Sequence, residues 1–174
     1  MEVSTLCAGN LNQYYYPHRY RLMRLGVKVF RKRGWKVTVL PHPGYTLPPR
    51  EGTVVGEDFA RMLNRAKIAF TCSMRYNYAL AKYAEIAACR TLPAGDIPGE
   101  RQEFFRDALL SLEPWMTDDE IVRTVEDVLD DPAELRRRTE RAYELTLQTS
   151  TMDHYAERFH AAATALLTKL GKPT

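Results

Sequence analysis

Short apolar runs recur along the first two thirds of the chain, separated by stretches with helical periodicity. The runs over residues 3–8, 35–40 and 68–72 are rich in β-branched and other apolar side chains, which is typical of strands buried in a core. Shorter apolar runs at residues 91–94 and 108–112 predict two further strands. Glycine, proline or asparagine follows most of these runs, as expected where strands end in turns.

The positions between the runs repeat with the period of a helix. From Pro17 to Gly34, the apolar residues Leu22, Leu25 and Val29 fall on one side and basic residues lie between them. The same periodicity predicts helices over residues 57–67, 78–89, 118–129, 133–147 and 151–170. Strands that alternate with helices indicate an α/β fold, in which helices cover both faces of a parallel sheet.

The final third of the chain is helical and has clear helix boundaries. Thr117 and Glu120 have the spacing of a capping box at the start of one helix, and Pro132 separates that helix from the next. With 174 residues, the chain has the length of one domain. We therefore expect a single three-layer domain over residues 1–174, with residues 133–172 as a helical tail packed on it.

Charge is distributed unevenly along the chain. Residues 1–50 contain nine Lys and Arg against one acidic residue, whereas residues 51–174 contain sixteen against twenty-one. The basic segment favours an anionic ligand or partner near the amino-terminal third, although a solvated basic helix face gives the same pattern.

With 45% hydrophobic and 27% charged residues, the composition excludes a disordered chain.

The cysteine and membrane signals predict a cytoplasmic protein. Cys7, Cys72 and Cys89 are an odd number at wide spacing, without the Cys and His cluster that a zinc site needs. We expect reduced thiols and no metal site. No apolar run reaches the roughly 18 residues of a membrane span, and the first residues lack the charged and apolar regions of a signal peptide.

Four loops of this chain follow predicted strands. Open parallel sheets bind ligands at the carboxyl ends of their strands, where loops lead into helices. In this chain that rule selects Gly9 and Asn10, the loop after Leu40, and the segments 73–77 and 95–99. Candidate binding residues are therefore expected in these loops.

The segment 73–77 leads into a helix that we expect to begin at Tyr78. Free backbone N–H groups at such a helix start, together with the helix dipole, favour a phosphate group, and Arg75 would add a cation. Within the helix, Lys82 and Glu85 lie three residues apart on one face. This pair is either a surface ion pair or a site whose carboxylate accepts hydrogen bonds from ribose hydroxyls. Sequence spacing leaves both alternatives open.

A longer pattern surrounds this helix. Residues 77–100, NYALAKYAEIAACRTLPAGDIPGE, resemble the signature of the carboxyl-terminal half of glycosyltransferases built from two Rossmann domains, the GT-B type. Residues 7–10, 16–19 and 151–159 are similar to the first strand end, the first helix start and the terminal helix of that half. The resemblance covers nearly the whole chain and implies a single Rossmann-like domain.

The resemblance also implies an activity, namely binding of a nucleotide diphosphate sugar and transfer of the sugar to an acceptor, without a metal or another cofactor. By position, Glu85 would hold the ribose, and Lys82 with the helix start at Tyr78 would hold the diphosphate. Gly9 would let the first loop approach the sugar phosphate closely, and Arg19 would be a second phosphate contact. The expected substrate-binding residues are Gly9, Asn10, Arg19, Arg75, Asn77, Tyr78, Lys82 and Glu85.

The chain departs from the family pattern in length. A complete enzyme of this type has an amino-terminal half that contributes the acceptor site and commonly a base, and this chain matches one half only. We therefore expect a partner, either such an amino-terminal half or a second copy of this chain. Arg90 stands where the family more often has a glycine. No catalytic residue is assigned, and His42 is the histidine to test because its loop follows a strand.

Three other functions compete with this one. A non-catalytic nucleotide-sugar-binding or assembly module would share every binding residue. A nucleic-acid-binding domain would use the helix over residues 18–33, whose seven basic side chains follow Tyr14, Tyr15 and Tyr16, but the acidic remainder of the chain argues against it. A dinucleotide-dependent oxidoreductase is disfavoured, because the first strand ends without a GxGxxG pattern.

Overall fold

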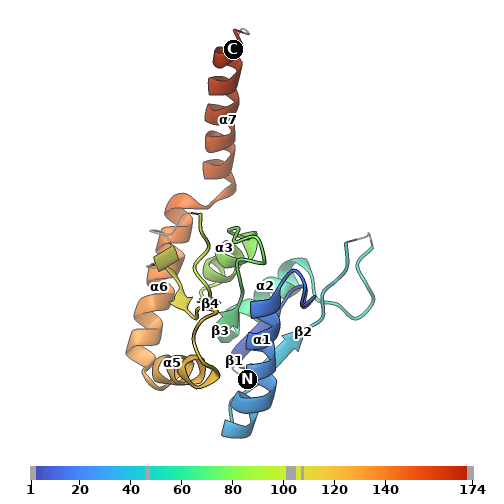
Figure 1. Cartoon of the computed structure of the whole chain (residues 1–174), viewed down its shortest axis with the longest axis vertical. Coiled ribbons are helices and arrows are strands. Elements are labelled where there is room, and N and C mark those ends of the chain that lie inside the picture. Colours follow the sequence, from blue (N-terminus) through green and yellow to red (C-terminus); the bar gives the residue numbers. More distant parts are fainter. Residues whose placement is uncertain (1–2, 46–47, 101–104, 107, 172–174) are drawn as a thin grey trace.

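Five parallel strands form the central sheet, in the order β2-β1-β3-β4-β5 (Figure 1). The computed structural model describes residues 3–45, 48–100, 105–106 and 108–171 of the chain. The strands are β1 (Val3–Ala8), β2 (Val37–Leu40), β3 (Ala66–Phe70), β4 (Leu92–Gly95) and β5 (Leu110–Ser111). Every pair of neighbours is parallel, so the predicted parallel sheet is confirmed.

Helices cover both faces of this sheet. They are α1 (Pro17–Leu25) with its continuations η1 (Gly26–Phe30) and η2 (Arg31–Arg33), α2 (Gly56–Asn64), α3 (Ala81–Ala88), α5 (Asp118–Asp130), α6 (Pro132–Thr149) and α7 (Met152–Lys169). On one face, α1, η1 and α5 pack around Phe30 and Phe70, whose ring centroids are 6.2 Å apart. On the other face, α2 and α3 pack around Leu63, Ala69 and Ile86. The three-layer α/β prediction is therefore confirmed.

The chain changes direction across the sheet beside β1. This strand leads into α1 on one face, whereas its neighbour β3 leads into α3 on the other face. The loops after the two strands therefore diverge and leave room at the carboxyl ends. Such a switch point is where open parallel sheets bind their ligands.

The start of α3 differs from the prediction. The helix begins at Ala81 and not at Tyr78. Leu80 has an extended backbone, with φ −77° and ψ 147°, so a helix cannot run through it from Tyr78. Met74 and Asn77, in the turn before it, have left-handed φ angles of 55° and 58°. The N–H of Tyr78 is bonded instead to the carbonyl oxygen of Ser73 at 2.9 Å. The segment before α3 is therefore a tight turn, and the helix N-terminus lies further along the chain.

Two other predicted elements have wrong boundaries, because strand pairing decides where they end. The helix predicted over residues 57–67 spans Gly56–Asn64, because the residues after it already pair with β1 as part of β3. The strand predicted over residues 108–112 is confined to Leu110–Ser111, where β4 lies opposite. In both cases the neighbouring strand decides where the regular structure begins and ends.

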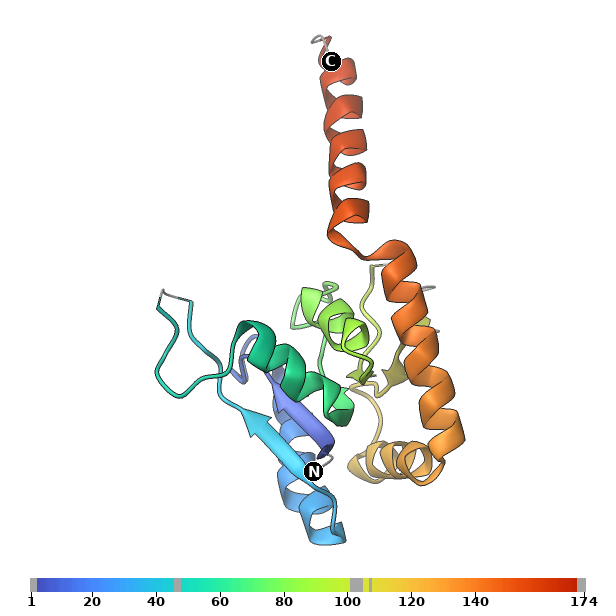
Figure 2. The ribbon, with the colours of Figure 1, turned by 180° about the vertical axis from the view of Figure 1, so that it is seen from behind.

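The three carboxyl-terminal helices pack differently. The predicted capping box of α5 is present, with the Thr117 hydroxyl accepting from the Glu120 N–H at 3.2 Å and the Glu120 carboxylate accepting from the Thr117 N–H at 2.7 Å. Helix α6 packs on α3, where Ala87 and Ala142 are buried together. Helix α7 has no buried residue and extends away from the body of the domain (Figure 1, Figure 2). Of the expected tail, α6 therefore packs on the domain and α7 does not.

The structure also shows the state of the cysteines and of the groups that could bind a metal or cross a membrane. Cys7, Cys72 and Cys89 are free thiols, and burial raises the pKa of each. No group of three or more His, Cys, Asp or Glu side chains in this part of the chain is placed to hold a metal ion. None of its helices combines the length and the apolar character that crossing a membrane requires.

Candidate functional site

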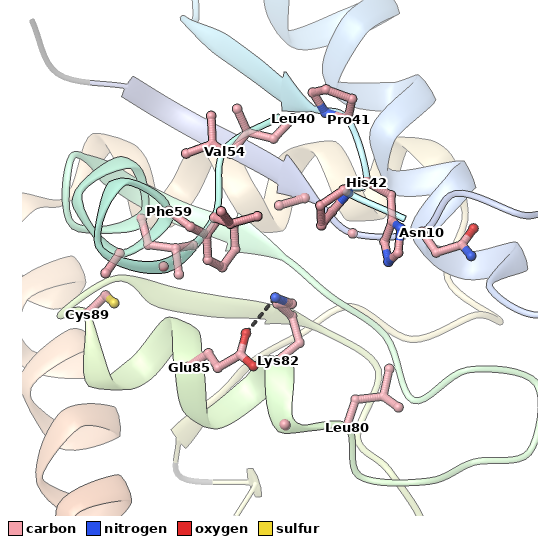
Figure 3. A pocket seen from close by; sticks show the side chains of 18 of the residues that line it. Asn10, Leu40, Pro41, His42, Val54, Phe59, Leu80, Lys82, Glu85 and Cys89 are labelled. Carbon is pink, nitrogen blue, oxygen red and sulfur yellow. Dashed lines mark hydrogen bonds and ion pairs between the residues drawn. The ribbon is translucent and has the colours of Figure 1, made fainter. Parts of the chain in front are cut away.

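A cavity of about 700 Å³ opens at the carboxyl ends of β1 and β2 and continues between α2 and α3 (Figure 3). The loops after the two strands form its polar end, through Gly9, Asn10 and His42. Apolar side chains of the two helices form the other end, among them Phe59 and Leu63. The cavity thus joins a polar mouth at the sheet edge to an apolar groove.

Five of the eight predicted binding residues line this cavity, namely Gly9, Asn10, Arg19, Lys82 and Glu85. They come from three segments of the chain, which are the loop after β1, helix α1 and helix α3. The parallel pairing of β1 with β3 brings these segments to one edge of the sheet. The tertiary structure therefore assembles most of the predicted set in one place.

The Gly9 turn and the Arg19 side chain fit closely against each other. Gly9 has a φ of +106°, and a Cβ atom at this position would lie 2.8 Å from Nη1 of Arg19. Arg19 is 3% exposed, its Nη1 donates to the carbonyl oxygen of Asn10 at 3.3 Å, and its guanidinium carbon lies 4.6 Å from the centroid of the Tyr16 ring. Its Nε and Nη2 have no hydrogen-bond partner among the described residues. An anion in the cavity would offset the charge of this buried cation, which is otherwise costly.

The first turn of α3 brings a cation and free N–H groups to the cavity. Leu80, the residue before the helix, makes no side-chain hydrogen bond to the helix N-terminus. Ala81, the first residue of the helix, lines the cavity. The Nζ atom of Lys82 is 2.5 Å from a carboxylate oxygen of Glu85 and 4.3 Å from the centroid of the Phe59 ring. The side chain of Glu85 is 47% exposed, so its carboxylate can accept further hydrogen bonds. The pair is thus an ion pair that also forms part of the cavity wall (Figure 3).

The loop after β2 contributes two rings to the polar end. Nδ1 of His42 accepts from the Gly44 N–H at 3.0 Å, so Nε2 carries the proton of the neutral ring. Burial lowers the pKa of His42, and the nearby cations Arg50, Lys82 and Arg19 lower it further. The Tyr45 hydroxyl accepts from the side-chain amide of Asn10 at 2.8 Å, and its ring centroid lies 4.6 Å from that of His42. At neutral pH, His42 is therefore a neutral hydrogen-bond donor and is poorly suited to be a base.

The other three predicted residues, Arg75, Asn77 and Tyr78, lie outside this cavity. The guanidinium of Arg75 is 4.2 Å from the centroid of the Tyr14 ring, and the side-chain oxygen of Asn77 accepts from the Gly99 N–H at 2.8 Å. Tyr78 is 55% exposed and precedes the helix. The turn expected to present a phosphate-binding helix start instead ties two loops together, and the helix start that does face the cavity is that of α3, three residues later.

Sequence reasoning missed the apolar part of the cavity. Val54, Phe59, Leu63 and Leu80 line it together, although they belong to three separate segments. Helical periodicity puts Phe59 and Leu63 on one side of their helix, but that signal is the same for a core face and for the wall of a groove. The separation between α2 and α3 that creates the groove is a property of the packed fold.

Comparisons with known proteins give a consistent result. A family model described as glycosyl transferase-like matches residues 10–161. Two solved structures with similar folds are an alpha-glucosyltransferase in complex with UDP, at a TM-score of 0.63 and 12% identity, and an alpha-glucosyltransferase in complex with UDP-glucose and DNA containing an abasic site, at 0.61 and 11%. Each match covers 90% of this chain and 50% of the other, so this chain spans half the length of those enzymes. A search of curated proteins finds no match.

Proposed function

Because the chain belongs to the glycosyl transferase-like family, we propose that its cavity binds a nucleotide diphosphate sugar and that the protein transfers the sugar to an acceptor without a metal. The observation that carries this proposal is the placement of Arg19, Lys82 and Glu85 around one cavity, which we name the donor cavity. Two cations suit a diphosphate, and a carboxylate beside them suits the hydroxyls of a ribose. Arg19 gives the strongest support, because its buried guanidinium forms no ion pair among the described residues and this donor would bring an anion to the cavity that it lines.

In this proposal the diphosphate binds at the polar end, between the Gly9 turn and the start of α3. Arg19 and Lys82 donate to its oxygens as cations, and Nε2 of His42 adds a neutral donor. The first N–H groups of α3, at Ala81 and Lys82, also donate to the diphosphate in this proposal. The positive end of the helix dipole favours its negative charge. These fixed donors stabilise the charge that develops on the nucleoside diphosphate as its bond to the sugar breaks.

The nucleoside would extend from the diphosphate into the apolar groove. Glu85, one turn along α3 from the first residue of the helix, accepts hydrogen bonds from the ribose. Val54, Phe59 and Leu63 supply apolar surface for a flat base between the two helices. The direction of the nucleotide therefore follows from the polarity of the cavity, with charge at the sheet edge and apolar contact between the helices.

Isothermal titration calorimetry tests this proposal with UDP, GDP and ADP, their glucose conjugates and inorganic pyrophosphate. We expect at least one nucleoside diphosphate to bind. Glu85→Gln should weaken its binding about tenfold, or about 1.4 kcal/mol, because a charge-assisted hydrogen bond to the ribose is lost. Pyrophosphate has no ribose, so its affinity should stay the same. Glu140→Gln removes an acidic partner of Arg90 on the surface of α6 and is the matched control.

Several outcomes would contradict the proposal. Absence of binding to every nucleotide would remove both the enzyme and the binding-module alternatives. An equal loss of pyrophosphate affinity in Glu85→Gln would show that Glu85 acts by holding Lys82 and not by binding ribose. Transfer or binding that disappears with excess chelator would overturn the metal-independent part.

The length of the chain bears on its partners and on where it works. Since the chain spans half of the two glucosyltransferases, we propose that a second folded unit, either an amino-terminal half or another copy of this chain, completes the enzyme. Size-exclusion chromatography with light scattering, with and without nucleotide, distinguishes the two, because a second copy gives a dimer and a missing amino-terminal half leaves this chain a monomer. The free thiols agree with a reducing compartment, and we propose the cytoplasm.

The nucleic-acid alternative loses support from the contacts of α1 and its continuations. Arg21 is 2.6 Å from Asp118, Arg33 pairs with Glu126, and Arg31 donates to a backbone carbonyl oxygen 3.0 Å away. Arg19, a fourth basic residue of this segment, is buried at the donor cavity. Much of the basic character is therefore used inside the fold. The non-catalytic module remains the closer competitor, and an assay of sugar release from the donor separates it from an enzyme.

A further inference from the structure

Tyr45 connects two loops at the polar end of the donor cavity, although its side chain is 78% exposed. Its hydroxyl oxygen accepts a hydrogen bond from Nδ2 of Asn10, a residue 35 positions earlier in the chain. Asn10 belongs to the loop after β1, and Tyr45 belongs to the loop after β2. The parallel pairing of β1 with β2 brings both loops to the same edge of the sheet, where these two side chains meet.

The loop after β2 holds the Tyr45 ring beside His42. The Gly44 N–H donates to Nδ1 of His42 at 3.0 Å, and Gly44 has a φ of +95°, which glycine adopts without strain. The ring centroids of Tyr45 and His42 are 4.6 Å apart, so the two rings pack against each other. Tyr45 is therefore held both at its ring and at its hydroxyl group, which is unusual for a side chain so exposed to water.

The two groups that hold Arg19 in place are both next to Tyr45. Nη1 of Arg19 donates to the carbonyl oxygen of Asn10, and the guanidinium carbon lies over the Tyr16 ring. The side chain of Asn10 is bonded to the Tyr45 hydroxyl. The hydroxyls of Tyr16 and Tyr45 are also neighbours, since burial and then Tyr45 raise the pKa of Tyr16. A displacement of Tyr45 would therefore reach Arg19 through Asn10 and through Tyr16.

These contacts connect donors that lie on different elements. Arg19 is on α1 and His42 is on the loop after β2, and Tyr45 contacts His42 itself and both neighbours of Arg19. Hydrogen bonds from a cation to a phosphate oxygen are strongest over a narrow range of distances. Donors that are already in place when an anion binds avoid the entropic cost of being ordered by it. The connection through Tyr45 thus favours an anion that contacts Arg19 and His42 together.

We propose that the hydrogen-bonded pair of Asn10 and Tyr45, which we name the Asn10–Tyr45 clasp, positions Arg19 and His42 on the diphosphate of the donor. The inference rests on the proposed function of the donor cavity. The Tyr45 ring orients His42, and the Tyr45 hydroxyl acts on Arg19 through Asn10 and Tyr16, so Tyr45 is a positioning residue. The clasp serves the diphosphate, whereas Glu85 serves the ribose from α3.

Tyr45→Phe tests the clasp, because it keeps the ring beside His42 and removes the hydroxyl. Calorimetry measures its affinity for inorganic pyrophosphate and for the best-binding nucleoside diphosphate. Both ligands should bind about fivefold more weakly, because they share the diphosphate that Arg19 contacts. Glu85→Gln should differ, since only the nucleotide loses affinity in that variant. The free energy of unfolding should be unchanged in Tyr45→Phe, because the side chain is largely exposed.

Two further variants follow the connection from Tyr45 to the anion. Asn10→Ser removes the amide that donates to Tyr45, and its hydroxyl can still accept from the Asn12 N–H, as the Asn10 side chain does at 2.8 Å. It should weaken binding as much as Tyr45→Phe does, and combining the two should cause no further loss. When Arg19 is already replaced in Arg19→Met, adding Tyr45→Phe should change pyrophosphate affinity less than twofold, because the group that the hydroxyl positions is absent.

Tyr155→Phe is the matched control, because it changes an exposed tyrosine on α7 and should alter neither affinity. Unchanged pyrophosphate affinity in Tyr45→Phe, or a full fivefold loss in the Arg19→Met background, would overturn the clasp and leave the proposed function intact. Additive losses from Asn10→Ser and Tyr45→Phe would overturn it as well. Pyrophosphate binding that depends on Tyr45, without binding of any nucleotide, would support the clasp and contradict the proposed function. Absence of binding to every ligand would contradict both.

Discussion

The carboxyl edge of the sheet carries different sets of charged side chains on its two sides. Beside β1 and β2, the donor cavity carries Arg19 and Lys82, whereas Asp96 and Glu113 follow β4 and β5 on the other side. Two further cavities open on this second side and also have Arg75 and Arg106 in their walls, so acids and bases alternate there, whereas the polar end of the donor cavity collects cations. The two sides share no lining residue, because the start of α1 separates them.

Two arginines of α1 show the same difference at closer range. Arg19 is buried at the donor cavity with two nitrogens that lack partners among the described residues. Arg21 uses Nε, Nη1 and Nη2 to donate to Asp118 and to the carbonyl oxygens of Pro114 and Met116. The second arginine is satisfied by the fold, whereas the first keeps two nitrogens without a partner among the described residues.

The largest expected effect comes from Arg19→Met. Loss of a buried cation from a diphosphate site should weaken nucleotide binding at least about 100-fold, or about 2.7 kcal/mol. The free energy of unfolding should be no lower than in the wild type, because the guanidinium is buried with unpaired nitrogens in the ligand-free protein. Calorimetry with the best-binding nucleotide and urea unfolding measure the two quantities.

Arg21→Met is the matched control and should show the reverse. It removes an ion pair and two hydrogen bonds to backbone carbonyl oxygens, so unfolding should become easier while nucleotide affinity is unchanged. If both variants lost affinity equally, the proposed division of roles between Arg19 and Arg21 would be wrong.

A smaller effect is expected on the second side, from Asp96→Asn. The buried Asp96 carboxylate accepts from the Ser73 N–H at 2.9 Å and from the Ser73 hydroxyl. Replacing it by an amide should reduce the free energy of unfolding by about 2 kcal/mol, because charge-assisted hydrogen bonds are lost. Nucleotide affinity should not fall, since a negative charge is removed. Asp127→Asn, at an exposed position of α5, should change neither quantity, and a fall in nucleotide affinity in Asp96→Asn would contradict the separation of the two sides.

The smallest effect concerns pH and the histidines of the two sides. The pKa of His18 is lower in the folded protein than the 6.5 of the unfolded chain, so the unfolded chain binds more protons as the pH falls below 6.5. Stability should therefore decrease on acidification, and His18 should account for up to about 1 kcal/mol of that loss. His42 acts in the same direction, chiefly through burial, and a bound diphosphate should reduce the smaller part that comes from Arg50, Lys82 and Arg19.

Urea unfolding at pH 7.5 and pH 5.5 checks this dependence with and without nucleotide. His18→Gln should show a smaller difference between the two pH values, and nucleotide should not remove the contribution of His18. A pH dependence identical to that of the wild type would mean that His18 is not held neutral by the fold.

Local patterns in the sequence predicted the elements well where the cause is local. The capping box of Thr117 and Glu120 needs only residues three apart, and it is present. The predicted start of α3 is wrong because Leu80 is extended, and the turn before it is held by contacts made elsewhere, such as the hydrogen bond from the Gly99 N–H to the Asn77 side chain. A turn fixed by a distant loop leaves little trace in its own residues.

The candidate site also has a part that local spacing predicts and a part that only the packed fold decides. Lys82 and Glu85 share a helix face by spacing alone, and the structure brings that face to the donor cavity. Arg75 stood beside the expected helix start but stacks on Tyr14 instead, whereas Arg19 is buried at the cavity. Which of two arginines meets the ligand depends on how loops pack, and burial of one guanidinium is decided by the Gly9 turn across from it.

The sequence by itself determined that this protein is an α/β domain with a parallel sheet and that Glu85 lies with Lys82 on one helix face, because periodicity and helix spacing are properties of neighbouring residues. The tertiary structure alone decided which strand ends meet. Pairing of β1 with both β2 and β3 brings Arg19 to a cavity with His42 and turns His18 toward the opposite side of α1. Those contacts join residues far apart in the chain, and their free energy comes from burial and charge that only the folded packing creates.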